Sequence, residues 1–354
     1  MPFQNFISVP VSCRFAWLAF VLTIIFTVNG CVPRSESEVV VYASVDREYA
    51  GPIFDAFERT ENAPSVARQF DIESSKTVGL TTRILQEKAR PKCDLFWNGE
   101  ILNTIRLQKA GMLQTRNWRL PDGWPKDTFA ASDGTWVGVG ARARVLLVNK
   151  NLLSKESDWP RSVAELSDPK WKKKCGLAKP LYGTTATHFL VLAETSARSS
   201  KGDEEFVRWA EDVARNAVVL SGNKQVAQAV SSGQIAWGLT DTDDAQIEID
   251  NGGAVEMIYP DQGTGGDGCL LIPTTVSVLK GSPHPIAADL LANYLASKTV
   301  ESRLTMGNAA TFALWPGSDK SIANHQDKIK FMKVNFEAAA NLWEATYEKL
   351  QKVF

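Results

Sequence analysis

The sequence predicts an α/β protein of two lobes, in which each lobe is an open, mostly parallel sheet flanked by helices and a cleft lies between the lobes. Three observations carry this prediction. Short β-branched runs alternate with segments of helical periodicity from Val39 onward, and a second alternating series follows Arg144. The chain has 354 residues, enough for two domains of ordinary size.

The first alternating series runs from residue 39 to residue 113. The run "VVVYAS" is typical of a buried parallel strand. The helix after it has Pro52 in its first turn, and a later helix is closed by Gly111, where left-handed backbone geometry is needed. The elements expected in order are a strand at 39–44, helices at 52–61 and 74–91, a strand at 93–98 and a helix at 100–113.

The second series repeats this alternation and then returns to the first lobe. Its expected strands are 144–150, 235–240 and 255–260, and its expected helices are 184–196, 204–216, 224–233 and 243–253. Residues 269–281 form a returning strand, with helices over the remainder to Phe354. We therefore expect lobe 1 at 39–143, lobe 2 at 144–270, and a return to lobe 1 with C-terminal helices at 271–354. The strand ends of open α/β sheets then face a shared cleft.

The N-terminus has the pattern of an export signal. "FAWLAFVLTIIFTVNG" follows Arg14 and is shorter than the roughly 20 apolar residues that span a bilayer. Cys31 comes at once after Val28-Asn29-Gly30, an order that resembles a bacterial lipobox, in which the cysteine is lipidated. We expect a lipoprotein signal peptide at 1–30 and a tether at 31–38. The protein would be exported, on the periplasmic or cell-surface side, and lipid-anchored to a membrane; an ordinary signal peptide with a chance cysteine is the alternative.

The net charge and the cysteines limit the partners and covalent bonds that we expect for this chain. The formal net charge is −1, which does not favour nucleic acid, and we expect a monomer. Beyond the signal, Cys93, Cys175 and Cys269 permit one disulfide and one free thiol, with the pairing left open. The sequence has no CxxC spacing, so we do not expect a zinc site.

Three aspartates crowd the stretch "GLTDTDDA", directly after an apolar strand. Asp241, Asp243 and Asp244 are hard oxygen donors suited to Ca²⁺, Mg²⁺ or ferric iron, at the end of a strand that should face the cleft. Alternatively, Asp241, Thr242 or Asp243 caps the helix that follows. We expect the cluster as a whole to contact a ligand.

The stretch "YGTTATHF" opens a helix whose first amides can hold an anion. Gly183, Thr184, Thr185 and Thr187 are the candidate anion-binding residues. A threonine cap without a ligand is the alternative. Arg142 and Arg144, where the chain crosses between lobes, can add bidentate positive charge.

An enzyme is not expected. The chain has three histidines and no Gly-x-Ser-x-Gly motif. Asp241-Thr242-Asp243 has the Asp-x-Asp form with which glycosyltransferases hold a metal and a nucleotide sugar, which leaves one enzyme hypothesis open. The export signal argues against it, because nucleotide sugars are cytoplasmic.

Five segments in order carry a resemblance to a known family: "VVVYASVDREYAGPIFDAFE", "CDLFWNGEILNTIRLQKAGML", "DPKWKKKCGLAKPLYGTTATHF", "VAQAVSSGQIAWGLTDTDDA" and "IPTTVSVLKGSPHPIAADLLANYLAS". The chain resembles the ferric-iron-type periplasmic solute-binding proteins of ABC transporters, relatives of thiamine and phosphonate binders. The resemblance implies a type II periplasmic-binding fold that closes on a solute by a hinge motion. It also implies an ABC permease and its ATPase as partners.

The resemblance also implies a site, with departures. The two adjacent tyrosines of ferric binders correspond here to Asp243 and Asp244, and the family's histidine corresponds to Asp46. Its glutamate falls near Gly99 and Glu100. The implied metal ligands are therefore Asp46, Asp243, Asp244 and Glu100, with a synergistic phosphate or carbonate at the Thr184–Thr187 helix start. The alternative is an organic phosphate or phosphonate at that helix start, such as thiamine phosphate or an aminoalkylphosphonate, with the aspartates accepting hydrogen bonds.

Overall fold

A computed structural model describes residues 37–71, 78–199 and 202–354. The expected signal peptide, the lipidation site Cys31 and most of the tether lie outside these residues. These described residues form one compact unit. Within the described ranges, no helix has the length and apolar character needed to cross a membrane.

The described strands form one mixed sheet. The order is β2-β1-β3-β9-β4-β7-β5-β6, and β8 also pairs with β4. The strands are β1 (Glu38–Ala43), β2 (Ser65–Phe70), β3 (Leu95–Asn98), β4 (Trp136–Asn149), β5 (Cys175–Ala178), β6 (Val218–Leu220), β7 (Trp237–Asp241), β8 (Val255–Ile258) and β9 (Leu271–Val278).

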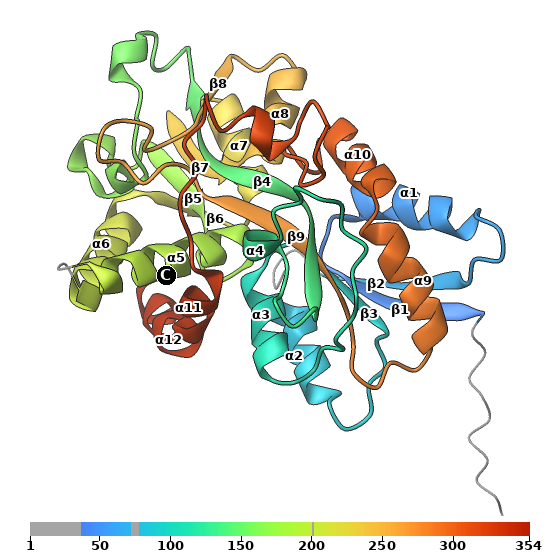
Figure 1. The fold of residues 1–354 in the computed structure, drawn as a ribbon. Helices are drawn as coiled ribbons and strands as arrows, with labels where there is room; N and C mark the ends of the chain where they lie inside the picture. Colours follow the sequence, from blue (N-terminus) through green and yellow to red (C-terminus); the bar gives the residue numbers. More distant parts are fainter. Residues whose placement is uncertain (1–36, 72–77, 200–201) are drawn as a thin grey trace, which may run out of the picture. The chain divides into compact units, whose positions relative to one another are not determined.

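The long strand β4 joins the two ends of this sheet. It pairs antiparallel with β9 as far as Ala143, which lies opposite Leu271, and from Arg144 onward it pairs with β7. Figure 1 shows β4 and β9 side by side, between the strands of the first series and those of the second. The α/β class is confirmed, but in place of separate, mostly parallel sheets the described residues form one sheet with four parallel and four antiparallel pairings.

Residues along β4 alternate between two hydrophobic cores. Val145 and Leu147 belong to the larger core, which also holds strand residues of β1, β3 and β9. Leu146 and Val148 belong to the smaller core around β5 and β7. Successive side chains of a strand point to opposite faces, so a strand buried on both faces reads as a continuous apolar run.

A bulge interrupts β4 shortly before the change of partner. The register with β9 shifts between Gly138 and Ala141, and Gly140 has a φ of +64°. A Cβ at Gly140 would lie 2.8 Å from the Cβ of Ala310. The buried Glu301 accepts a hydrogen bond from the Gly140 N–H at 2.8 Å and also binds the Leu314 and Trp315 amides. The bulge is therefore held by contacts from a later part of the chain.

Helices cover the sheet, mostly where the periodicity predicts them. They are α1 (Arg47–Glu58), α2 (Val78–Gln86), α3 (Leu102–Lys109), α4 (Lys126–Phe129), α5 (Gly183–Arg198), α6 (Gly202–Asn216), α7 (Asn223–Ser231), α8 (Thr242–Asp250), α9 (Pro285–Leu295), α10 (Lys298–Met306), α11 (Phe336–Asn341) and α12 (Trp343–Val353). The short 3-10 helices are η2 (Glu156–Asp158), η3 (Val163–Ser167), η4 (Pro169–Trp171) and η5 (Ile322–Asn324). One expectation is wrong: α1 begins at Arg47, so Pro52 lies inside the helix rather than in its first turn.

The C-terminal helices connect elements from both series. The helix α11 packs against α3 and α5, and α12 packs against α5 and α6 (Figure 1). Arg106 of α3 forms an ion pair with Glu344 at 2.9 Å and stacks over the Trp343 ring at 4.5 Å from its centroid.

The three cysteines within the described residues are all buried free thiols, so the disulfide that their number permits is not formed. Burial raises the pKa of the Cys175 and Cys269 thiols to about 12. A thiol with so high a pKa is unreactive, because the thiolate is the nucleophile.

Candidate functional site

Four helix starts surround one cavity. The first turns of α1, α5, α7 and α8 contribute lining residues, and the cavity has a volume of about 130 Å³. Helix starts carry unpaired amides and a positive dipole end, so such a cavity favours negatively charged groups, either from the protein or from a ligand. The protein supplies five carboxylates to its wall, namely Asp46, Glu48, Asp241, Asp243 and Asp244.

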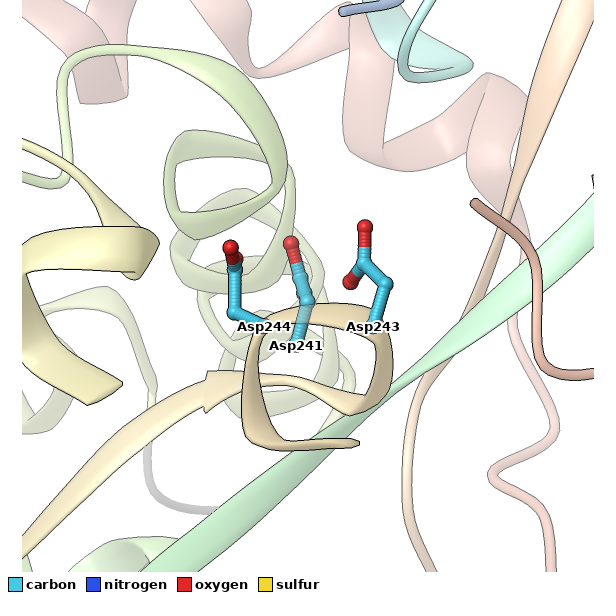
Figure 2. Close-up of side chains that lie close together, drawn as sticks. All are labelled: Asp241, Asp243 and Asp244. Carbon is cyan, nitrogen blue, oxygen red and sulfur yellow. The ribbon is translucent and has the colours of Figure 1, made fainter. Parts of the chain in front are cut away.

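Three of these carboxylates come from one short turn. Asp241 is the last residue of β7, and Asp243 and Asp244 lie in the first turn of α8, with no loop between strand and helix. One oxygen from each of the three lies within 4.8 Å of the others. Figure 2 shows the three side chains projecting to the same side of the helix start. The expected gathering of carboxylates at the end of this strand is present.

Both carboxylate oxygens of Asp241 accept hydrogen bonds from other side chains of the protein. It is 1% exposed, and its Oδ1 accepts a hydrogen bond from Arg144 Nη1 at 2.6 Å. Its Oδ2 accepts hydrogen bonds from the Thr184 hydroxyl at 2.6 Å and from Asn223 Nδ2 at 3.0 Å. Burial alone would raise its pKa, but Arg144, Arg142 and the Thr184 hydrogen bond hold the pKa below its usual value. Asp241 stands at the cap position of α8, yet its side chain caps no helix amide.

One of the two carboxylate oxygens of Asp243 accepts a hydrogen bond and the other does not. Its Oδ2 accepts a hydrogen bond from Arg142 Nη1 at 3.1 Å, whereas its Oδ1 is buried and has no hydrogen-bond partner. Burial raises the pKa of Asp243 to about 6; Arg142 opposes this shift, and Asp241 and Asp46 add to it. A buried acceptor without a donor costs roughly 1–3 kcal/mol, so this oxygen favours a cation or a donor that enters the cavity.

Arg142 lines the cavity and contacts two other lining residues, Asp243 and Gly99. Its Nη2 donates to the carbonyl oxygen of Gly99 at 2.5 Å, and its Nη1 donates to Asp243. Its Nε is buried without a partner. Burial lowers the pKa of the guanidinium, but Asp243 and Asp241 outweigh burial and keep the pKa above its usual value, so Arg142 carries a full positive charge.

The remaining predicted residues divide into two groups. Asp46 precedes α1 and lines the cavity without capping that helix through its side chain, and Asp244 is half-buried on the cavity wall. Gly183, Thr184 and Thr185 also line the cavity. Gly183 has a φ of +56°, a backbone conformation that favours glycine at the start of α5.

Arg144, Thr187 and Glu100 lie outside the cavity lining. Arg144 is fully buried beneath the cavity, where it also binds the hydroxyls of Thr184 and Thr185 at 3.1 and 3.2 Å. The Thr187 hydroxyl donates to Glu100 Oε2 at 2.6 Å.

The carboxylate of Glu100 closes the start of α3. It accepts hydrogen bonds from the Leu102 amide at 2.6 Å and the Asn103 amide at 3.0 Å, and the residue is fully buried. The structure thus places the three outlying residues where they position helices rather than where they would touch a solute.

Several lining residues were not singled out by the sequence analysis. Asn223 begins α7 and exchanges hydrogen bonds with Thr184 and Thr185, and Lys224 follows it and lies 3.9 Å from Glu48 of α1. Tyr49, Lys179 and Glu48 are further lining residues of this kind. The glycine at 222 before α7 is the signal that could have indicated another helix start at the site, but only the fold brings α1 and α7 together.

His188 lies in α5 one turn beyond this cluster. It is 1% exposed, and its Nδ1 has no hydrogen-bond partner. Burial first, and then the charge of Arg144, lower the pKa of His188 to about 3, so the ring is neutral. It is a core histidine.

Comparison with known proteins places this chain in a family. Residues 100–341 match the family of bacterial extracellular solute-binding proteins. Because that match spans more than half of the chain, the protein belongs to this family, which consists of non-enzymatic solute-binding proteins. The resemblance inferred from the five sequence segments is confirmed. The extracellular location of this family agrees with the expected export.

The individual relatives have low sequence identity to this chain. The major ferric iron-binding protein of Neisseria meningitidis is 26% identical over 229 residues, which are 63% of this chain and 62% of that protein. The match therefore spans less than two thirds of that relative's length.

Two solved structures share the fold over nearly the whole chain. Iron-bound HitA from Pseudomonas aeruginosa has a TM-score of 0.73 at 21% identity, over 89% of this chain and 99% of that chain. AfuA from Actinobacillus pleuropneumoniae, with fructose-6-phosphate bound, has a TM-score of 0.73 at 20% identity, over 89% of this chain and 97% of that chain.

Proposed function

We propose that this protein is the solute-binding lipoprotein of an ABC importer, anchored through Cys31, that captures ferric iron together with a synergistic anion and presents it to a permease and its ATPase. Family membership supports the class of protein. The relative from Neisseria meningitidis, named for ferric iron, supports the cargo.

The observation that carries the iron proposal is the unpartnered Oδ1 of Asp243 in a cavity lined by Asp46 and Asp244. Carboxylate oxygens are the hard ligands that a trivalent cation prefers. We assign Asp46, Asp243 and Asp244 as the iron ligands. Glu100 is left out, because its oxygens bind amides and the Thr187 hydroxyl.

The anion of this proposal lies at the start of α5. The amides of Gly183, Thr184 and Thr185 open that helix on the cavity wall, and Lys179 lines the same cavity. Asp241 and Arg144 serve as positioning residues, because their ion pair at 2.6 Å ties the start of α8 to the hydroxyls that open α5.

Two lobes with a hinge remain part of the proposal. The change of partner in β4 between Ala143 and Arg144, opposite Leu271, supports lobe 1 at 39–143, lobe 2 at 144–270 and a return at 271–354. Capture would close the lobes about these crossings, with Asp46, directly before α1, on one side and Asp243 and Asp244 of α8 on the other.

An organic phosphate is the second candidate. The sequence resemblance implies that Asp243 and Asp244 stand where ferric binders have tyrosines, and Lys179 and Lys224 line the cavity beside two helix starts. In this alternative a phosphate group lies on the helix starts, and the aspartates accept hydrogen bonds from hydroxyls or an amine.

Thermal unfolding of the chain from Val32 onward, stripped of ligand, tests both candidates. Ferric iron with and without phosphate is compared with thiamine phosphate, sugar phosphates and aminoalkylphosphonates. A true ligand at about a hundredfold its dissociation constant adds roughly 2.7 kcal/mol of stability. A ferric shift that is lost in Asp243→Ala supports the iron proposal, whereas a shift with an organic phosphate alone refutes it.

A further inference from the structure

Four basic side chains gather at one edge of the sheet, on the loop that leads into β3 and the loop that follows β9. Residues 88–92, "KARPK", precede β3, and residues 279–288, "LKGSPHPIAA", run from β9 into α9. The two loops are in contact, because a Cβ at Gly281 would lie 3.5 Å from the Cγ of Pro91. Neither loop contains a carboxylate, and among the described residues none of the four cations has an ion-pair partner. These exposed cations, which we call the basic edge, are Lys88, Arg90, Lys92 and Lys280.

The buried Asp94 ties the first strand to this edge. Its Oδ2 accepts a hydrogen bond from the Val40 amide at 2.7 Å and lies 2.7 Å from His284 Nδ1. Its Oδ1 accepts hydrogen bonds from the Ser282 hydroxyl and the His284 amide, both at 2.7 Å. These contacts join the start of β1 to the turn between β9 and α9. The chain therefore enters the fold beside the basic edge.

The proposed lipid anchor is close to this point along the chain. Seven residues, from Cys31 to Ser37, precede Glu38, the first residue of β1. An extended chain spans at most about 3.6 Å per residue, so a lipid on Cys31 would hold the start of β1 within roughly 25 Å of the membrane. The edge of the sheet at the start of β1 would then stay within reach of the lipid headgroups.

The start of α9 adds exposed apolar side chains to the same edge. This helix packs against β1 and β9 and begins where the loop after β9 ends (Figure 1). Ile286 is 63% exposed and Leu290 is 49% exposed, one helical turn apart. Apolar side chains beside basic ones are the combination with which a protein surface enters the headgroup region of a membrane.

We propose that the basic edge, together with Ile286 and Leu290, is a membrane-docking face that binds anionic phospholipids. The inference rests on the lipid anchor of the proposed function. Basic side chains are attracted to an anionic membrane surface over about one Debye length, and the exposed Glu38 offsets only one of the four positive charges. The ligand-binding cavity lies at the other end of β1, because Asp46 follows that strand. Docking would therefore turn the cavity away from the membrane and leave it open to solute.

Acetylation of lysines in the native lipoprotein tests this face. The protein is reconstituted in phosphatidylcholine vesicles with and without phosphatidylglycerol and treated with acetic anhydride, and mass spectrometry gives the rate at each lysine. With phosphatidylglycerol, the lysines of the basic edge should react at least about threefold more slowly. The protection should disappear at about 1 M salt, where the Debye length is about 3 Å. Lys172 and Lys174, which are exposed just before β5, are internal controls and should react equally in both kinds of vesicle.

Two double variants separate this face from general effects of charge. Lys88→Glu with Lys92→Glu should abolish the protection of Lys280. Lys172→Glu with Lys174→Glu reverses the same number of charges and should leave that protection intact. Both variants should bind ferric iron as the native protein does, because none of these lysines lines the cavity.

The native protein distinguishes failure of the docking face from failure of the anchor. Equal acetylation of Lys280 with and without phosphatidylglycerol, in protein whose mass includes the lipid on Cys31, would overturn the inference and leave the anchor standing. A mass that lacks this lipid would refute the anchor, and the inference with it.

Discussion

The buried His188 should make the protein lose stability in mild acid. Its pKa is about 3 in the folded protein, against an ordinary value of about 6.5, because burial and Arg144 disfavour the charged ring. The folded-state pKa is the lower one, so the unfolded chain binds a proton first as the pH falls. The stability is complete above about pH 6.5 and is lost progressively between there and about pH 3.

The size of this loss follows from the two pKa values. Each pH unit below the unfolded pKa costs about 1.4 kcal/mol, so at pH 5 the native state should be about 2 kcal/mol less stable than at pH 8 through His188 alone. Urea unfolding at both pH values, on native protein and on His188→Gln, isolates this contribution. The native protein should lose about 2 kcal/mol more than the variant.

The comparison between the two proteins is the control, because every carboxylate titrates equally in both. An equal loss of stability in native protein and His188→Gln would mean that His188 titrates normally. The ring would then have a partner or access to water, and the account of its burial would be wrong.

Three further substitutions test the contacts around the site. Arg144→Met should destabilise the protein by roughly 3–5 kcal/mol in urea unfolding, because it leaves the buried charge of Asp241 without its cation, and removing that charge as well should recover part of the loss. Glu100→Ala should cost about 1–2 kcal/mol through the lost cap of α3 without changing ferric affinity; a large loss of affinity would return Glu100 to the ligand set. Gly140→Ala should cost at least about 1–2 kcal/mol in thermal unfolding, because the bulge needs a positive φ and the new Cβ would meet Ala310; an unchanged midpoint would show that β4 can relax.

Local periodicity predicted most elements of the fold. Helices such as α6 and α7 and strands such as β7 lie where spacing and turn residues indicate, because burial of one face leaves a repeating pattern in the sequence. The start of α1 was misplaced, since Pro52 reads as a first-turn residue and the structure accommodates it inside the helix.

The pairing of β4 was beyond such patterns. A run that is apolar on both faces indicates a buried strand but not its neighbours, and β4 changes from β9 to β7 within one residue. Strand partners far apart in the sequence are chosen by the packing of the whole chain, so the single mixed sheet could not be predicted from local pattern.

The candidate site divides in the same way. The residues of one turn, Asp241, Asp243 and Asp244, are neighbours in sequence, and their place at the end of an apolar strand was enough to predict a cluster of carboxylates. Which of them can meet a solute depended on distant partners. Arg144 donates a hydrogen bond to Asp241. Arg142 donates to only one oxygen of Asp243, and the other oxygen has no hydrogen-bond partner.

Glu100 and Tyr49 show, in opposite ways, that the sequence alone does not decide which residues line the cavity. Glu100 was expected at the site and instead closes a helix, while Tyr49 escaped notice and lines the cavity. The order of residue types along the chain specifies strands, helices and the chemistry of each turn, because these depend on near neighbours. The choice of which polar groups neutralise one another belongs to the tertiary structure, because hydrogen bonds and ion pairs act between atoms a few ångströms apart, whatever their separation in sequence.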